Sequence, residues 1–159
     1  MKDGFIKVAA ASPMIKVADA EYNAGKVIEC MKKAADKGVM VLVFPELTLT
    51  GCSCYDLVGH SVILRGAERA LERVIEASAG SDMLVIVGLP YAPRGGALYS
   101  VAAVISDGEL LGLVPRSETD GTLFAAADDE GGEETVCGKF DTFFDTELLF
   151  TSDVLPGLS

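Results

Sequence analysis

Glu46 is the residue of this sequence best placed for acid–base chemistry. It follows the apolar run at residues 39–44, with only Pro45 between them. Open sheets with crossover helices place their sites at the carboxyl ends of strands, and a carboxylate partly removed from water there can act as a general base. The simpler interpretation is a loop glutamate that only accepts hydrogen bonds. The rest of the sequence has to decide between the two.

Thiols are the second group suited to chemistry. The chain has four cysteines and no C-x-x-C pair: Cys30, Cys52, Cys54 and Cys137. Cys52 and Cys54 lie in the loop after Glu46, where either thiol could be a nucleophile or, with His60, a metal ligand. Their spacing is not that of usual zinc sites and a fourth ligand is missing, so we expect inert thiols and no bound metal. His60 is the only histidine, so a Ser-His-Asp triad within this sequence would have to use it.

The elements that position Glu46 are expected to follow in the order strand, helix, strand. Residues 5–11 are apolar with one lysine and predict a first, largely buried strand. Residues 19–37 carry apolar side chains at steps of three and four, with Asp19 as a cap and Gly38 as the end, and predict an amphipathic helix. Residues 39–44 are all apolar, which predicts a strand covered on both faces.

The second half of the chain predicts a change to antiparallel pairing. A helix is expected around residues 64–75 and a strand at 83–89. Glycine-containing turn sequences at 94–96 and 106–109 then separate apolar runs, which is typical of hairpins. The acidic stretch 117–135 predicts a solvated loop, and residues 139–151 one more strand or hairpin. We therefore expect a single α/β domain with a mixed sheet.

Composition excludes several classes of function. The chain has 159 residues, of which 50% are hydrophobic and 23% charged, and a formal net charge of −11. This charge repels nucleic acid and anionic membranes, so neither is expected as a partner. No apolar segment has the length of a membrane span and no secretory signal is evident, so the expected location is cytoplasmic.

Five motifs give the sequence a family resemblance. Residues 44–51 (FPELTLTG) resemble the glutamate motif of the nitrilase, or carbon–nitrogen hydrolase, superfamily. Residues 18–23, 51–57, 112–116 and 144–150 resemble, in matching order, the amino-terminal glutaminase domain of glutamine-dependent NAD⁺ synthetases. The similarity runs over nearly the whole chain.

The resemblance implies a nitrilase-type α-β-β-α sandwich with two central sheets of mixed strands, incomplete at its carboxyl end. Residues 1–159 would be a partial glutaminase domain without its synthetase domain. No cofactor is implied for the glutaminase domain, because ATP and Mg²⁺ belong to the synthetase domain. The resemblance also implies assembly into a homo-oligomer.

A Glu-Lys-Cys triad is the catalytic machinery that the resemblance implies. Glu46 matches the base, and Arg116 stands at the position of the lysine that stabilises the oxyanion. A guanidinium is bulkier than an ammonium and keeps its proton, so this is a real departure. The nucleophilic cysteine would follow Pro156-Gly157 by about one strand length, ~5 to 7 residues, which lies beyond Ser159. Cys52 and Tyr55 would border the substrate pocket, with Cys52 at a place where relatives often carry tyrosine.

The expected parent function is hydrolysis of the glutamine amide to supply ammonia for NAD⁺ synthesis. Residues 1–159 alone are expected to be inactive, because no cysteine stands at the nucleophile position. Two alternatives stay open: a degenerate, non-catalytic module for assembly or regulation, and an amidase that acts on another small amide.

Overall fold

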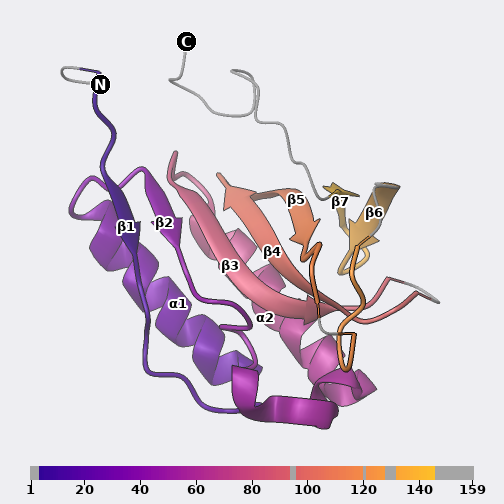
Figure 1. The fold of residues 1–159 in the computed structure, drawn as a ribbon. Helices are drawn as coiled ribbons and strands as arrows, with labels where there is room; N and C mark the ends of the chain where they lie inside the picture. The colour runs from indigo at the N-terminus through magenta and orange to yellow at the C-terminus, as the bar shows by residue number, and fades with distance from the viewer. Residues whose placement is uncertain (1–3, 94–95, 120, 128–131, 146–159) are drawn as a thin grey trace.

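A computed structural model describes residues 4–93, 96–119, 121–127 and 132–145 of the chain (Figure 1). The elements in chain order are β1 (Val8–Ala10), α1 (Ala20–Ala35), β2 (Val41–Val43), the 3₁₀ segment η1 (Cys52–Gly59), α2 (Ser61–Ser78), β3 (Leu84–Tyr91), β4 (Tyr99–Ser106), β5 (Glu109–Pro115), β6 (Gly132–Val136) and β7 (Phe140–Phe144).

The described strands form one mixed sheet in the order β1-β2-β3-β4-β5-β7-β6. β1, β2 and β3 are parallel to one another, while β4 is antiparallel to both β3 and β5. β5 therefore runs in the same direction as β2 and β3. The carboxyl ends of all three strands reach the same edge of the sheet, the lower edge in Figure 1. The predicted mixed α/β sheet is confirmed.

Helix α1 begins after the predicted cap and ends at Ala35, two residues before the predicted end at residue 37. The Asp19 carboxylate accepts a hydrogen bond from the backbone N–H of Tyr22 at 3.1 Å, which satisfies one of the free amides of the first turn. Gly38, with a φ of +66°, lies just beyond the carboxyl end and lets the chain turn back into β2. Each helix thus serves as the crossover between two parallel strands.

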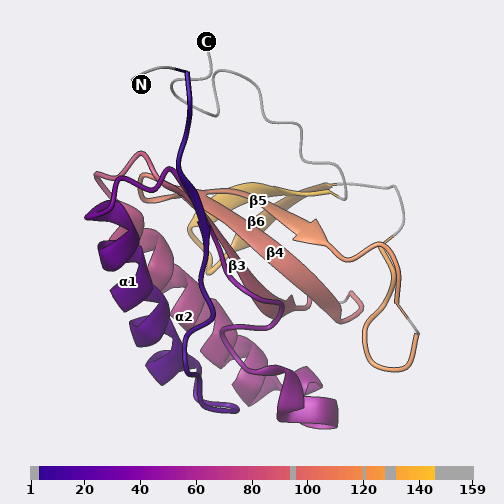
Figure 2. The same ribbon diagram turned by 60° about the vertical axis from the view of Figure 1, so that its left-hand side comes forward.

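Both helices pack on the same face of the sheet (Figure 2). Val27 of α1 and Leu71 and Val74 of α2 are each 0% exposed. They belong to one core that also contains the helix-facing side chains of β3 and β4, which are Val85, Val87, Leu89, Val101, Ala103 and Ile105. Burial of each large aliphatic side chain stabilises the fold by about 1.5 to 3 kcal/mol. No helix of the described residues is long and apolar enough to cross a bilayer.

The opposite face of the sheet is less covered than the sequence predicts. Phe5 and Val8 of the expected first buried strand are 84% and 63% exposed. Within the predicted range 5–11, only β1 (Val8–Ala10) forms a strand. In β2, Leu42 on the helix side is 1% exposed while Val43 on the other side is 38% exposed. The expectations of a largely buried first strand and of a second strand covered on both faces are wrong within the described residues, because both helices lie on one side (Figure 2). The described part is one helix layer on one sheet layer of the expected sandwich.

The hairpin predicted at residues 106–109 is present. Ser106 pairs with Glu109, and the two residues between them, Asp107 and Gly108, have φ of +46° and +78°. β3 and β4 are also antiparallel neighbours, with Tyr91 opposite Tyr99. Residues 94 and 95 of the other predicted turn lie outside the described part of the chain.

A strand lies within a stretch expected to be a loop. β6 pairs with β7 through the register Val136↔Phe140, and the turn uses Cys137 and Gly138 with φ of +56° and +68°. The acidic residues in this stretch favour a loop, but pairing with an apolar strand outweighs that preference. Residues 128–131 and the part of the last predicted strand from 146 onward lie outside the described residues.

Candidate active site

The topology brings Glu46, Ser100 and Arg116 to one edge of the sheet. Glu46 follows β2 and Arg116 follows β5, two strands that run in the same direction. Ser100 is near the start of β4, which runs the opposite way and so begins at that edge. Side chains separated by 54 and 70 positions in sequence thus meet.

The turn that carries Glu46 is tightly folded. Leu47 takes a left-handed conformation with a φ of +52°, and its carbonyl accepts hydrogen bonds from the backbone N–H groups of Thr50 and Gly51 at 3.1 and 2.7 Å. The N–H of Leu49 donates to the carbonyl of Gly88 in β3 at 3.2 Å. Leu47 and Leu49 are 6% and 0% exposed, so the turn is anchored by apolar side chains as well.

Asn23 of α1 fixes the far side of this turn. Its side-chain amide is 0% exposed and donates to the carbonyls of Lys16 and Leu49 at 2.8 and 3.1 Å, while its oxygen accepts from the N–H of Lys16 at 2.7 Å. A buried amide with these bonds ties the segment before α1 to the segment after Glu46. Removal of the side chain leaves buried backbone groups without partners.

Gly88 allows β3 to pass directly beneath the turn. A Cβ atom at this position would lie 2.6 Å from the N of Leu47, 2.7 Å from the O of Pro45 and 2.8 Å from the Cα of Glu46. All three are backbone atoms, which cannot move aside without moving the turn. The absence of a side chain at position 88 therefore sets the distance between the sheet and the carboxylate.

The Glu46 carboxylate is held through one of its two oxygens. Its Oε1 accepts a hydrogen bond from Ser100 Oγ at 2.7 Å and lies 3.4 Å from an Arg116 guanidinium nitrogen. The side chains of Glu46 and Arg116 are 47% and 53% exposed, whereas Ser100 is 3% exposed. The site thus joins a carboxylate and a cation that are both open to a ligand, with a buried hydroxyl behind the carboxylate.

The backbone of Arg116 is held by the strand next to it. Its N–H donates to the carbonyl of Ser100 at 2.9 Å, and its carbonyl accepts from the N–H of Ala127 at 3.2 Å. The guanidinium itself makes only the contact to Glu46 among the described residues. Its remaining N–H groups are free to bind a carbonyl or carboxylate oxygen.

Cys52 and Tyr55 both lie in η1, beside the turn rather than on the carboxylate. The exposed thiol of Cys52 donates to the backbone carbonyl of Glu46 at 3.5 Å. The side chain of Tyr55 is 72% exposed, and its backbone has a φ of +47°. Their assignment to a substrate pocket stays a prediction.

The thiols of Cys54 and Cys137 make their hydrogen bonds away from the Glu46 carboxylate. Cys54, which is 2% exposed, donates to the carbonyl of Thr50 at 3.1 Å. Cys137 donates to the carbonyl of Glu68 at 3.2 Å, and burial, together with the nearby Glu68 carboxylate, raises the pKa of its thiol to about 11. Such a thiol is almost entirely protonated at neutral pH and is a weak nucleophile. No thiol among the described residues contacts the Glu46 carboxylate.

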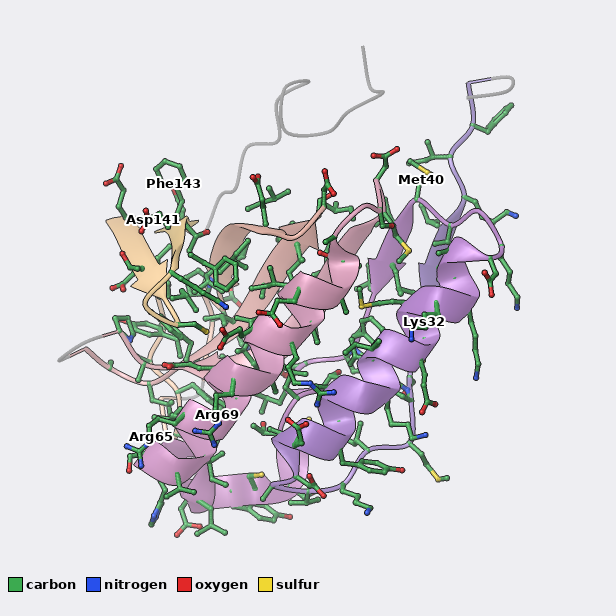
Figure 3. All side chains as sticks on the ribbon, turned by 180° about the vertical axis from the view of Figure 1, so that it is seen from behind. Lys32, Met40, Arg65, Arg69, Asp141 and Phe143 are labelled. Carbon is green, nitrogen blue, oxygen red and sulfur yellow. The ribbon has the colours of Figure 1, made fainter. Side chains whose placement is uncertain are left out.

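Two hollows differ in their relation to this site. An apolar hollow of about 330 Å³ lies beside the turn and is lined by Ala10, Ala11, Ser12, Val43, Phe44 and Pro45. Another of about 270 Å³ lies between α2 and the β6–β7 turn, where Figure 3 shows Arg65 and Arg69 on α2. The second hollow shares no residue with the Glu46 site. The first is lined by Pro45, the residue before Glu46, but not by Glu46 itself.

Three residues of the site are absent from the sequence prediction: Ser100, Asn23 and Gly88. The signals in the sequence are weak but present. Ser100 is a lone hydroxyl near the start of an otherwise apolar strand, Asn23 interrupts an apolar helix face, and Gly88 sits in the middle of an apolar run. A glycine inside a strand often marks a close approach of another backbone.

Comparison with known proteins identifies the family of the chain. Residues 7–141 match the family model of the carbon–nitrogen hydrolases. Glutamine-dependent NAD(+) synthetases from Mycobacterium tuberculosis (strain H37Rv) and Mycobacterium leprae are 34% and 32% identical to the chain over 161 and 162 residues. These alignments cover 97% and 98% of this chain but 23% and 24% of the relatives, so the chain spans about a quarter of their length.

Solved structures with the same fold include two kinds of protein. A glutamine-dependent NAD(+) synthetase from Cytophaga hutchinsonii superposes with a TM-score of 0.78 at 20% identity, covering 87% of this chain and 25% of that one. An amidase from Nesterenkonia sp. gives a TM-score of 0.66 at 14% identity and covers 89% of this chain and 55% of that one. At these identities the likeness concerns the fold alone.

Proposed function

This chain belongs to the carbon–nitrogen hydrolase family, and we propose that its Glu46–Arg116 site takes part in hydrolysis of the side-chain amide of glutamine. The observation that carries the proposal is the 3.4 Å approach of a guanidinium to a carboxylate at the edge where β2 and β5 end. Hydrolysis of an amide through a thiol uses a proton acceptor and a positive charge near the developing oxyanion, and this pair can supply both. Glutamine is chosen because the sequence relatives are named glutamine-dependent.

The proposed reaction gives the two charged groups different tasks. Glu46 accepts the proton of a thiol, whose sulfur then bonds to the amide carbon, and negative charge collects on the carbonyl oxygen near Arg116. The C–N bond breaks as Glu46 returns the proton to the leaving nitrogen, which departs as ammonia. Water then hydrolyses the thioester to glutamate. Arg116 stabilises charge but does not transfer a proton, because a guanidinium stays protonated.

We also propose that none of Cys30, Cys52, Cys54 and Cys137 is the nucleophile. Among the described residues the nearest thiol contact is from Cys52 to the backbone carbonyl of Glu46, not to its carboxylate. A general base has to reach the proton that it removes. The polypeptide of residues 1–159 by itself is therefore expected to release no ammonia from glutamine.

The test of this expectation is an ammonia and glutamate assay with glutamine. The polypeptide of residues 1–159 should give the blank rate. Turnover above blank would contradict the expectation, and its disappearance in Cys52→Ser would identify Cys52 as the nucleophile.

The wider proposal is tested in the natural polypeptide encoded by the complete reading frame. There Glu46→Gln should lower ammonia release at least ~100-fold, because it removes the proton acceptor. Glu29→Gln, an exposed glutamate on α1, is the matched control and should retain the parent rate. A Glu46→Gln variant as active as the parent would end the proposal.

The names of the same relatives support a proposal for the destination of the ammonia. We propose that it is used for NAD⁺ synthesis by a synthetase domain, which would be where ATP and Mg²⁺ bind. Analysis of the coding sequence beyond residue 159 tests this directly. A Glu-x-Cys on the next strand followed by an ATP-binding domain supports it, and a stop codon supports a non-catalytic module.

Two observations favour a second function as an alternative. The cation at this site is a guanidinium that contacts the base itself, and an exposed thiol lies beside the turn. These features suit either a non-catalytic module or an amidase for a different small amide. A panel of glutamine, acrylamide and butyramide assayed with the complete natural polypeptide separates the cases, because the module turns over none of them.

A further inference from the structure

Ser100 contacts the side chain of Glu46 and the backbone of Arg116 from a buried position. Its hydroxyl donates to Glu46 Oε1 at 2.7 Å, and its carbonyl accepts the backbone N–H of Arg116 at 2.9 Å. The residue is 3% exposed, while the Glu46 side chain is 47% exposed. A half-exposed carboxylate on three rotatable bonds thus receives its shortest hydrogen bond from a rigid strand.

The two oxygens of the carboxylate have unequal surroundings. Ser100 and Arg116 both approach Oε1, and Oε2 has no partner among the described residues. An oxygen that already accepts two hydrogen bonds is the poorer proton acceptor, because its lone pairs are engaged. The arrangement leaves Oε2 as the oxygen that is free to accept a proton.

We propose that Ser100 is the positioning residue of Glu46: its hydroxyl holds Oε1 so that one rotamer of the side chain presents Oε2 to the nucleophile. The role of Oε2 rests on the proposed function, whereas the hold on the rotamer does not. General-base catalysis depends on reach and direction, so a carboxylate that samples several rotamers spends only part of its time in the productive one.

The experiment measures the rotamer itself in the isotope-labelled polypeptide of residues 1–159. Three-bond couplings report the χ1 angle of Glu46, and the Glu46→Gln variant identifies its signals. We expect single-rotamer couplings in the parent, rotamer-averaged couplings in Ser100→Ala, and recovery in Ser100→Thr, which keeps the hydroxyl. If Ser100 only supported the structure, restoring the hydroxyl alone in Ser100→Thr would not restore the single-rotamer couplings of Glu46.

Ser106→Ala is the matched control. Ser106 lies on the same strand and the same face, is 8% exposed, and its hydroxyl makes no hydrogen bond among the described residues. It should leave the couplings of Glu46 unchanged. If Ser100→Ala does not fold, Ser100→Cys replaces it, since a thiol keeps the volume but is a weak donor. A single Glu46 rotamer in folded Ser100→Ala or Ser100→Cys would overturn the proposal.

A kinetic measurement separates this proposal from the proposed function. In the complete natural polypeptide, Ser100→Ala should lower kcat for glutamine about tenfold and change KM by less than about twofold, because the lost contact acts on the base rather than on binding. Absence of glutamine hydrolysis in the parent would contradict the proposed function, while the couplings would still decide the role of Ser100.

Discussion

The two charged groups of the site are held in very different ways. The Glu46 side rests on a turn with buried leucines, on the Asn23 hydrogen bonds and on direct backbone contact with β3 at Gly88. On the Arg116 side the backbone is paired, but the guanidinium is 53% exposed and its one contact among the described residues is 3.4 Å long. The base is preorganised by the fold, and the cation is not.

This difference indicates which parts of the site carry stability as well as chemistry. Changes around the Glu46 turn disturb buried backbone and should destabilise the protein. Changes to the guanidinium should leave the fold intact, since exposed ion pairs contribute little. Urea unfolding of variants at three positions measures this difference in stability.

Gly88→Ala should have the largest effect. The added Cβ would lie within 2.8 Å of three backbone atoms, so the turn or β3 has to move, at a cost of about 3 kcal/mol in the free energy of unfolding. Gly25→Ala is the control, because Gly25 lies in helix α1 and an added Cβ there has no atom within 4 Å. It should stabilise the protein by about 0.5 to 1 kcal/mol. Equal effects at the two positions would refute the close contact.

Asn23→Ala should have an intermediate effect. It removes three hydrogen bonds and leaves the buried carbonyl of Leu49 without its donor, which costs about 2 kcal/mol. Lys33→Ala, an exposed change in the same helix, should alter the free energy of unfolding by less than about 0.5 kcal/mol. A loss for Asn23→Ala no larger than for Lys33→Ala would show that the turn does not depend on this amide.

Arg116→Ala should have the smallest effect on stability. Loss of an exposed contact of 3.4 Å is expected to change the free energy of unfolding by less than about 0.5 kcal/mol, and Arg116→Lys by no more. Urea unfolding of both variants beside Gly88→Ala checks the order. A loss above ~1.5 kcal/mol for Arg116→Ala would mean that the cation is part of the fold and would remove the contrast between the two sides.

Much of the scaffold was predictable because its signals are local. The cap at Asp19, the glycine after α1 and the glycine turn at residues 107–108 each determine backbone conformation within a few positions. Glu46 was located in the same way, from the apolar run before it. The assignment of Glu46 and Arg116 to one catalytic site rests on the family resemblance; their side chains lie 3.4 Å apart, and their roles stay a prediction.

The features that escaped prediction depend on contacts between distant segments. An apolar run such as residues 39–44 shows that a strand is hydrophobic but not whether both faces are covered, and Val43 is 38% exposed. Likewise, nothing near Ser100 in sequence indicates that its hydroxyl meets a carboxylate 54 positions away. Side-chain partners across a sheet follow from strand order, which local patterns do not determine.

The separation of these partners along the chain also bears on how the protein folds. The contact between Glu46 and Arg116 spans 70 positions and requires β2, β3, β4 and β5 to be side by side. Closure of long loops is entropically costly, so contacts of this range form late. An intermediate in which β5 has not yet joined the sheet would hold the carboxylate in its turn but lack the guanidinium. Competence for chemistry would then be among the last properties that the folding chain acquires.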